Sequence, residues 1–148
     1  HLTDAACRTF AQEIANYCEA YDLDGVFFDD EYTYSWNHPG LTSPSTDRAA
    51  RLCFETKMAM PDKMVTCYIY SRTYGFYKKI EGMEPGDFVD YAISDYGSWD
   101  YEDCYLGMER NQVAPCSANF AYSYARWTAT QNNLQRVLKI QFRQTPMS

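Results

Sequence analysis

The sequence lacks long apolar runs and clusters of metal-ligand residues. No stretch of about eighteen consecutive apolar residues occurs, so no transmembrane segment is expected. None of the six cysteines forms a CxxC pair, and the two histidines, His1 and His38, have no companion at metal-ligand spacing. No glycine-rich phosphate loop follows an expected strand. We therefore expect neither a metal nor a cofactor.

Basic residues are also scarce. Thirteen Lys and Arg stand against twenty Asp and Glu, which gives a formal net charge of -7 at pH 7. This balance argues against a surface that follows the phosphates of a nucleic acid. A neutral or cationic partner is expected instead.

Aromatic residues, by contrast, are abundant. The 148 residues include fourteen Tyr, eight Phe and three Trp, more than a core of this size usually needs. Tyr and Trp combine a flat apolar face with a polar edge, which suits a sugar ring. Aromatic residues also fill strands, so composition alone leaves both interpretations open.

The cysteine positions favour buried free thiols over a disulfide framework. Cys18 and Cys53 fall on the inner faces of expected helices, and Cys67 falls within an expected strand. Free Cys in such positions behaves as a small buried apolar residue. We expect most of the thiols to be reduced.

The pattern of apolar residues predicts alternating helices and strands. An amphipathic helix follows the N-cap candidate Thr3, with an apolar side that includes Phe10, Ile14, Tyr17, Cys18 and Tyr21. A second helix is predicted from about Ser45 or Thr46 to Met60, where Pro61 ends it. Strands are predicted over 23–28, 64–70, 88–94 and 112–120. A weakly patterned linker or helical turn is expected over 74–81, and a last helix from about Thr128.

This order is typical of repeated βα units, so the expected fold class is α/β with a parallel sheet. Polar and aromatic residues follow the strands, as in a (β/α)8 TIM barrel, where the active site is built at the carboxyl ends of the strands. A complete barrel needs about eight strands and about 250 residues. We therefore expect residues 1–148 to be a single incomplete segment of such a domain.

The stretch LDGVFFDDEY, residues 23–32, carries the most specific motif. It resembles the fourth-strand signature DGxDxDxE of glycoside hydrolase family 18, in the variant LDGVDFDDEY of bacterial endo-β-N-acetylglucosaminidases of the Endo H and Endo F kind. Nine of the ten residues match. Residues 64–71 and 89–99 resemble the fifth and sixth strands of that family. The resemblance implies a span from the third helix to the seventh βα unit of the barrel.

The resemblance also implies roles for individual residues. Glu31 would be the general acid/base, and Asp29 would assist the acetamide group of the substrate, which acts as nucleophile in this family. Tyr96 would hydrogen-bond the acetamide carbonyl. Tyr32, Tyr70 and Trp99 are further candidates for shaping the sugar site. Positions i and i+2 of a strand share a face, so Asp29 and Glu31 would both face the barrel interior.

One position departs from the family motif. Phe27 stands where the family has the first Asp of DxDxE. Asp29 therefore lacks a carboxylate partner at this position and gains an apolar neighbour, which alters its charge balance.

Two functions follow from these observations. The first is a retaining endo-β-N-acetylglucosaminidase that cuts the β-1,4 bond between the two core GlcNAc residues of N-glycans, with Asp29 and Glu31 retained for that purpose. The second is a catalytically impaired glycan-binding protein on the same barrel, which Phe27 favours. Both imply an N-glycan or another GlcNAc-containing oligosaccharide as partner, and an extracellular or cell-envelope location in a secreted or lipid-anchored bacterial protein.

Overall fold

The computed structural model describes residues 3–29, 45–69, 75–94 and 104–115. Within them, helices and strands alternate as the sequence predicts, and the α/β class is confirmed. The predicted continuation of the last strand to Phe120 and the helix from Thr128 lie outside the described residues. In chain order the elements are α1 (Asp4–Ala20), β1 (Gly25–Phe28), α2 (Thr46–Ala59), β2 (Met64–Ile69), α3 (Pro85–Phe88), β3 (Tyr91–Ser94), the 3-10 turn η4 (Arg110–Gln112) and β4 (Val113–Pro115).

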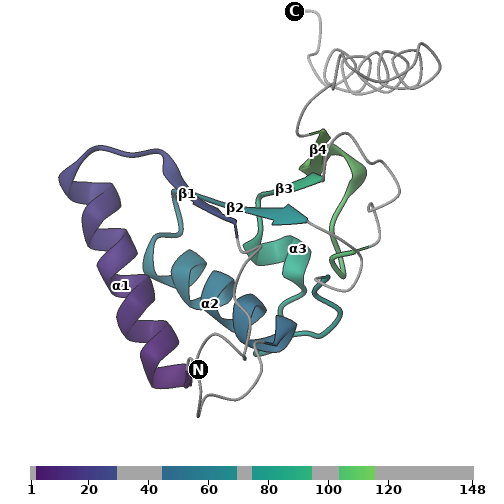
Figure 1. Ribbon diagram of the computed structural model, residues 1–148, viewed down its shortest axis with the longest axis horizontal. Helices are drawn as coiled ribbons and strands as arrows, with labels where there is room; N and C mark the ends of the chain where they lie inside the picture. Colours follow the sequence, from purple (N-terminus) through teal and green to yellow (C-terminus); the bar gives the residue numbers. More distant parts are fainter. Residues whose placement is uncertain (1–2, 30–44, 70–74, 95–103, 116–148) are drawn as a thin grey trace, which may run out of the picture.

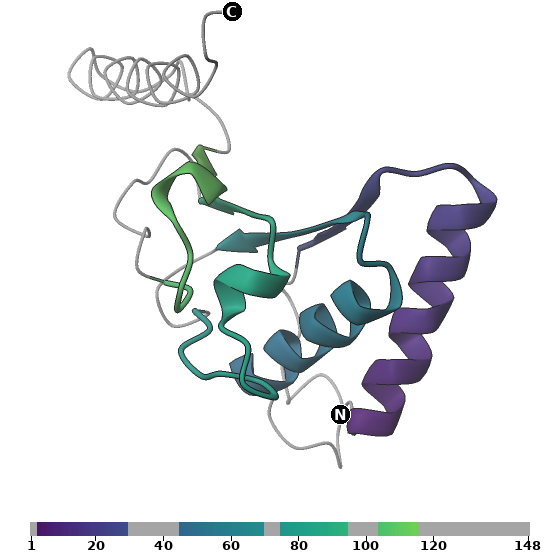
Figure 2. The same ribbon diagram turned by 180° about the vertical axis from the view of Figure 1, so that it is seen from behind.

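The four strands form one parallel sheet in the sequential order β1-β2-β3-β4. Both views show α1, α2 and α3 on the same side of this sheet (Figures 1 and 2). Parallel strands need a crossover connection between them, and α2 and the segment that contains α3 supply two such connections. The described part of the chain is thus a two-layer arrangement of sheet and helices.

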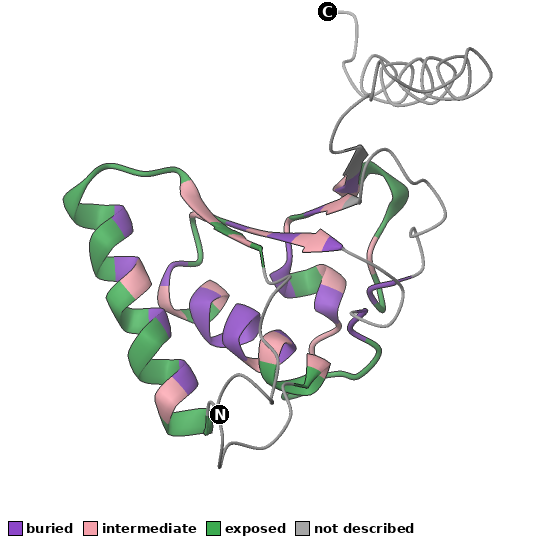
Figure 3. Ribbon diagram, in the orientation of Figure 1, coloured by how far each residue is buried: buried purple, intermediate pink, exposed green. Residues whose placement is uncertain are grey.

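The two faces of the sheet differ in burial (Figure 3). The strand residues that face the helices are almost fully buried: Val65, Cys67, Ile69, Ala92 and Val113. They alternate with residues of the opposite face, such as Phe27, whose side chain is 46% exposed. Among the described residues, no helix covers that opposite face. We call it the open face.

Helix α1 lies where the sequence predicts it, but it buries a different side. Thr3 caps it by accepting a hydrogen bond from the Ala6 amide at 3.1 Å. Its buried residues are small: Cys7, Ala11, Ala15 and Cys18. The predicted inward positions Phe10, Tyr17 and Tyr21 are exposed instead, which corrects that prediction. Two apolar stripes share this helix, and the small residues face inward because they allow α1 to approach α2 closely.

Helix α2 agrees closely with its prediction. The Ser45 side chain caps it by accepting a hydrogen bond from the Arg48 amide, and the helix ends at Ala59, just before Met60 and Pro61. Leu52, Cys53 and Met60 are buried on its inner side. Cys18, Cys53 and Cys67 are buried free thiols, which confirms the prediction made for these three positions.

Two segments between β2 and β3 differ from the predictions. The described part of the linker does not form a helical turn at Phe76. Phe76 instead pairs with Tyr105 in an isolated parallel bridge, and the two rings stack with their centroids 4.4 Å apart. The predicted strand over 88–94 is shorter, because residues up to Phe88 form α3, which Pro85 begins. A helix of four residues is too short to leave a periodic apolar pattern.

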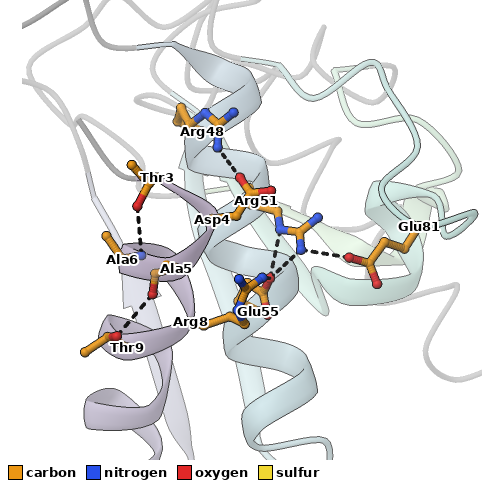
Figure 4. A network of polar contacts seen from close by, with 10 residues as sticks. All are labelled: Thr3, Asp4, Ala5, Ala6, Arg8, Thr9, Arg48, Arg51, Glu55 and Glu81. Atoms are coloured by element: carbon orange, nitrogen blue, oxygen red, sulfur yellow. Dashed lines mark hydrogen bonds and ion pairs between the residues drawn. The ribbon is translucent and has the colours of Figure 1, made fainter.

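A charged network attaches α1 and a neighbouring loop to α2 (Figure 4). The Glu55 carboxylate on α2 accepts hydrogen bonds from Arg51 at 2.8 Å and from Arg8 of α1 at 3.3 Å. Arg51 also pairs with Glu81 at 2.7 Å. The Glu55 side chain is only 9% exposed, so these partners supply the hydrogen bonds that water would otherwise provide.

None of the described helices has the length and apolar character that crossing a membrane requires.

Candidate active site

The predicted site residues follow three neighbouring strands. Asp29 comes directly after β1, Tyr70 directly after β2, and Tyr96 shortly after β3. Because these strands are parallel and adjacent, their carboxyl ends meet at one edge of the sheet. Ligands of α/β sheets bind at the carboxyl ends of the strands. The topology therefore brings the starting points of the three predicted segments together.

Asp29 is the one predicted site residue that the structure describes. Its side chain is exposed, and it has no hydrogen bond or ion pair with another described residue. The alternation of β1, carried one residue beyond the strand, assigns Asp29 to the open face together with Phe27. Five other predicted site residues lie outside the described ranges: Glu31, Tyr32, Tyr70, Tyr96 and Trp99.

A row of side chains lies one level below Asp29 on the open face. The strand register aligns Phe27 with Thr66 of β2 and Tyr91 of β3. Phe27 and Tyr91 are 46% and 45% exposed, and the Thr66 hydroxyl donates a hydrogen bond to the Val26 carbonyl at 2.9 Å. This row contains no carboxylate among its described members. Any ionised partner of Asp29 must therefore come from another level or from outside the described residues.

Sequence reasoning did not single out the open-face residues of β2 and β3. Thr66 and Tyr68 of β2 alternate with the buried residues Val65, Cys67 and Ile69. Ile93 of β3 lies in register with Tyr68. The alternation of aromatic or polar residues with small or aliphatic ones is the signal that could have identified these positions.

The opposite edge of the sheet has a different character. There the Asp90 carboxylate, just before β3, accepts a hydrogen bond from the Val65 amide at 2.7 Å. It also binds the Lys57 ammonium group of α2 at 2.9 Å. The Gln112 side-chain amide donates to the carbonyls of Gly86 and Val89 at 3.0 and 3.1 Å. Asp90 and Gln112 are thus engaged with backbone groups, and these contacts stabilise the fold at this edge.

The described residues also contain no group of three or more His, Cys, Asp or Glu side chains that could hold a metal ion. Asp29 supplies a carboxylate on the open face.

A comparison with family models finds no match. Comparisons with individual proteins find endo-β-N-acetylglucosaminidases among the relatives that match most of this chain. One is endo-β-N-acetylglucosaminidase F1 of Elizabethkingia meningoseptica, 46% identical over 89% of this chain. A probable chitinase, LysM18 of Penicillium expansum, is 34% identical over 62% of the chain. The chain is thus homologous to bacterial endo-β-N-acetylglucosaminidases, and the resemblance indicated by its sequence is confirmed.

Two solved structures of EndoBT-3987 from Bacteroides thetaiotamicron are similar to the described fold. The structure with Man5GlcNAc product has a TM-score of 0.64 and 42% sequence identity, and the complex with Man9GlcNAc2Asn substrate has a TM-score of 0.63 and 40% identity. Each similarity covers 75% of this chain. This chain spans 40% of the length of endo-β-N-acetylglucosaminidase F1 and 26% to 28% of the two solved chains.

Proposed function

We propose that residues 1–148 are one incomplete segment of the catalytic domain of an endo-β-N-acetylglucosaminidase of the glycoside hydrolase family 18 type. The 46% identity with endo-β-N-acetylglucosaminidase F1 over 89% of this chain is the observation that carries the proposal. The sequential parallel sheet supports a (β/α)8 barrel, of which β1 to β4 would be consecutive strands. In that arrangement the open face would be the barrel interior.

The proposed reaction is hydrolysis of the β-1,4 bond between the two core GlcNAc residues of an N-glycan. The EndoBT-3987 structures hold a Man9GlcNAc2Asn substrate and a Man5GlcNAc product, which supports this substrate class for a chain that is 40% to 42% identical. The partner is thus a neutral or weakly charged sugar rather than a nucleic acid, consistent with the net charge of -7.

The proposed mechanism uses two carboxylates and the substrate itself. Glu31 protonates the leaving oxygen, and the acetamide oxygen of the substrate attacks the anomeric carbon to form an oxazolinium ion. Asp29 orients the acetamide group and stabilises the positive charge that develops on it. Glu31 then removes a proton from the water that opens the ring, which restores the original anomeric configuration. Tyr96 would hydrogen-bond the acetamide carbonyl, while Tyr32, Tyr70 and Trp99 would shape the sugar site.

A second candidate is a glycan-binding protein that has lost catalysis. The observation that favours it is Phe27, which together with Thr66 and Tyr91 forms the level directly below Asp29. Phe27 places an apolar side chain where the family motif has a carboxylate, so Asp29 has no carboxylate neighbour at that position. For either candidate we propose an extracellular or cell-envelope location, in a secreted or lipid-anchored bacterial protein.

The test is to incubate a high-mannose glycopeptide with the natural protein that contains this chain and to analyse the products by mass spectrometry. We expect a peptide that retains a single GlcNAc. Glu31→Gln should abolish this product, whereas the control Glu19→Gln, at an exposed position of α1, should leave it unchanged. If the protein binds the glycan but releases none of it, and Phe27→Asp restores release, the glycan-binding function replaces the enzymatic one.

A further inference from the structure

Two buried cysteines on different elements lie in direct contact. The Sγ atoms of Cys53 on α2 and Cys67 on β2 are 3.4 Å apart. The two residues are only 2% and 3% exposed. Cys18, another buried thiol, instead donates to the Gly25 carbonyl at 3.6 Å. The pair therefore differs from a thiol that merely fills the core.

The surroundings of Cys53 favour its neutral thiol form once the protein is folded. The contact with Cys67 and the burial of the side chain raise the pKa of the Cys53 thiol well above its usual value. Tyr105 lies beside the pair, and burial together with the neighbouring thiols also raises the pKa of its hydroxyl well above the usual range. Because the thiolate is the reactive form of cysteine, Cys53 in the folded chain reacts slowly with outside reagents, and burial shields Cys67 from them as well.

We propose that Cys53 and Cys67 are the site of an intramolecular disulfide that joins α2 to β2. A disulfide has an S–S distance of about 2.05 Å, so the two sulfur atoms must approach by a little over 1 Å. Rotation about the Cα–Cβ bonds moves each sulfur atom without displacing the backbone. The fold thus has two covalent forms, one with two thiols and one with the cross-link.

Oxidation requires an acceptor for two electrons, and a small-molecule disulfide such as oxidised glutathione supplies it. The thiolate of one cysteine attacks oxidised glutathione, forms a mixed disulfide and releases one reduced glutathione. The thiolate of the second cysteine then attacks the protein sulfur of that mixed disulfide and releases the second reduced glutathione. Two thiols are oxidised, one glutathione disulfide is reduced to two thiols, and the two protons pass through solvent to the departing glutathione thiolates.

Burial determines when this reaction occurs. In the folded chain neither sulfur is accessible to glutathione, so the exchange takes place while the chain folds or opens. Once formed, the cross-link is shielded by the same burial. It closes a loop between positions 53 and 67, which lowers the unfolding equilibrium constant by about a hundredfold through restriction of the unfolded chain.

The experiment compares two ways of exposing the natural protein to a glutathione buffer rich in the oxidised form. One sample is fully reduced and unfolded, then refolded in the buffer, and the other is reduced and kept folded in it. Both are alkylated in denaturant, digested with trypsin and analysed by mass spectrometry. Cleavage after Arg51, Lys57, Lys63 and Arg72 separates the two cysteines into the peptides 52–57 and 64–72.

We expect the refolded sample to contain these two peptides joined by a disulfide, and the sample kept folded to contain them as separate alkylated peptides. The joined pair should disappear in Cys53→Ala and persist in Cys18→Ala, which removes a buried thiol outside the pair. Recovery of both peptides fully alkylated from the refolded wild-type protein, or joined to other cysteines, would overturn the proposal. Because the readout is chemical, it is independent of whether the protein hydrolyses glycans.

Discussion

The two edges of the sheet are built in opposite ways. At the amino edge, side chains bind backbone groups of neighbouring strands and connections, as Asp90 binds the Val65 amide and Gln112 binds the carbonyls of Gly86 and Val89. At the carboxyl edge, Asp29 is exposed and has no hydrogen bond to another described residue. The contrast indicates that Asp90 contributes to stability, whereas Asp29 is accessible at the edge where ligands of such sheets bind.

The largest expected effect tests the carboxyl edge. Asp29→Asn removes the charge proposed to stabilise the oxazolinium ion, so we expect kcat for glycan release to fall by about 10²- to 10³-fold. The urea midpoint of unfolding should stay within error of the wild type, because no described partner of Asp29 loses a bond. A fall in stability together with activity would show that Asp29 is a structural residue.

The second prediction tests the amino edge, where we expect stability to change and activity to stay the same. Asp90→Asn weakens the hydrogen bond to the Val65 amide and leaves the Lys57 ammonium group, only 15% exposed, without its ion pair. We expect the free energy of unfolding to fall by about 2 kcal/mol, while kcat per folded molecule stays unchanged. Urea denaturation and an activity assay normalised to the folded fraction measure both quantities. An unchanged midpoint would remove the distinction between the two edges.

The smallest expected effect concerns the exposed ion pair of Asp4 and Arg48, which joins two helices and belongs to neither edge of the sheet. The hydrogen bond from Arg48 lowers the pKa of the Asp4 carboxyl, an effect that its slight desolvation opposes. A lowered pKa in the folded state adds stability at pH values above the ordinary carboxyl pKa. This contribution is lost as the pH falls through the lowered value.

The corresponding measurement compares urea midpoints of the wild type and Asp4→Asn at pH 7 and at a pH below the lowered pKa of the Asp4 carboxyl. We expect a small deficit in the variant at pH 7, in keeping with an exposed pair, and coincident midpoints at the lower pH. A deficit of equal size at both values would mean that Asp4 stabilises the protein by something other than its charge.

Much of the fold could be predicted because its signals are local. The caps Thr3 and Ser45 and the terminator Pro61 define the helices, and the apolar run before Asp29 defines β1. The inward side of α1 could not be predicted, because two apolar stripes lie on that helix and only packing selects the small-residue stripe. The four-residue α3 is below the length at which periodicity can be detected.

The site was predictable to the extent that it follows strand ends. The motif after β1 and the parallel strand order predict the edge of the sheet at which Asp29 lies. They do not predict which side chains of neighbouring strands lie beside Phe27. The alignment of Phe27 with Thr66 and Tyr91 depends on strand register, which the turns and crossovers set over long separations in the sequence. The contact of Cys53 with Cys67 could not be predicted either, because it depends on how α2 packs against β2.

The connections before the strands and those after them also differ in length. At the amino edge, the chain enters β1 through residues 21–24, β2 through 60–63 and β3 through 89–90. On the other side, residues 29–45, 70–84 and 95–109 separate each of the first three strands from the next described helical element in the sequence. Short connections pinned by hydrogen bonds tolerate few insertions, whereas long connections outside the sheet accept them at little cost in free energy. Insertions after the strands should therefore cost less stability than insertions before them, where the short connections keep the sheet in register.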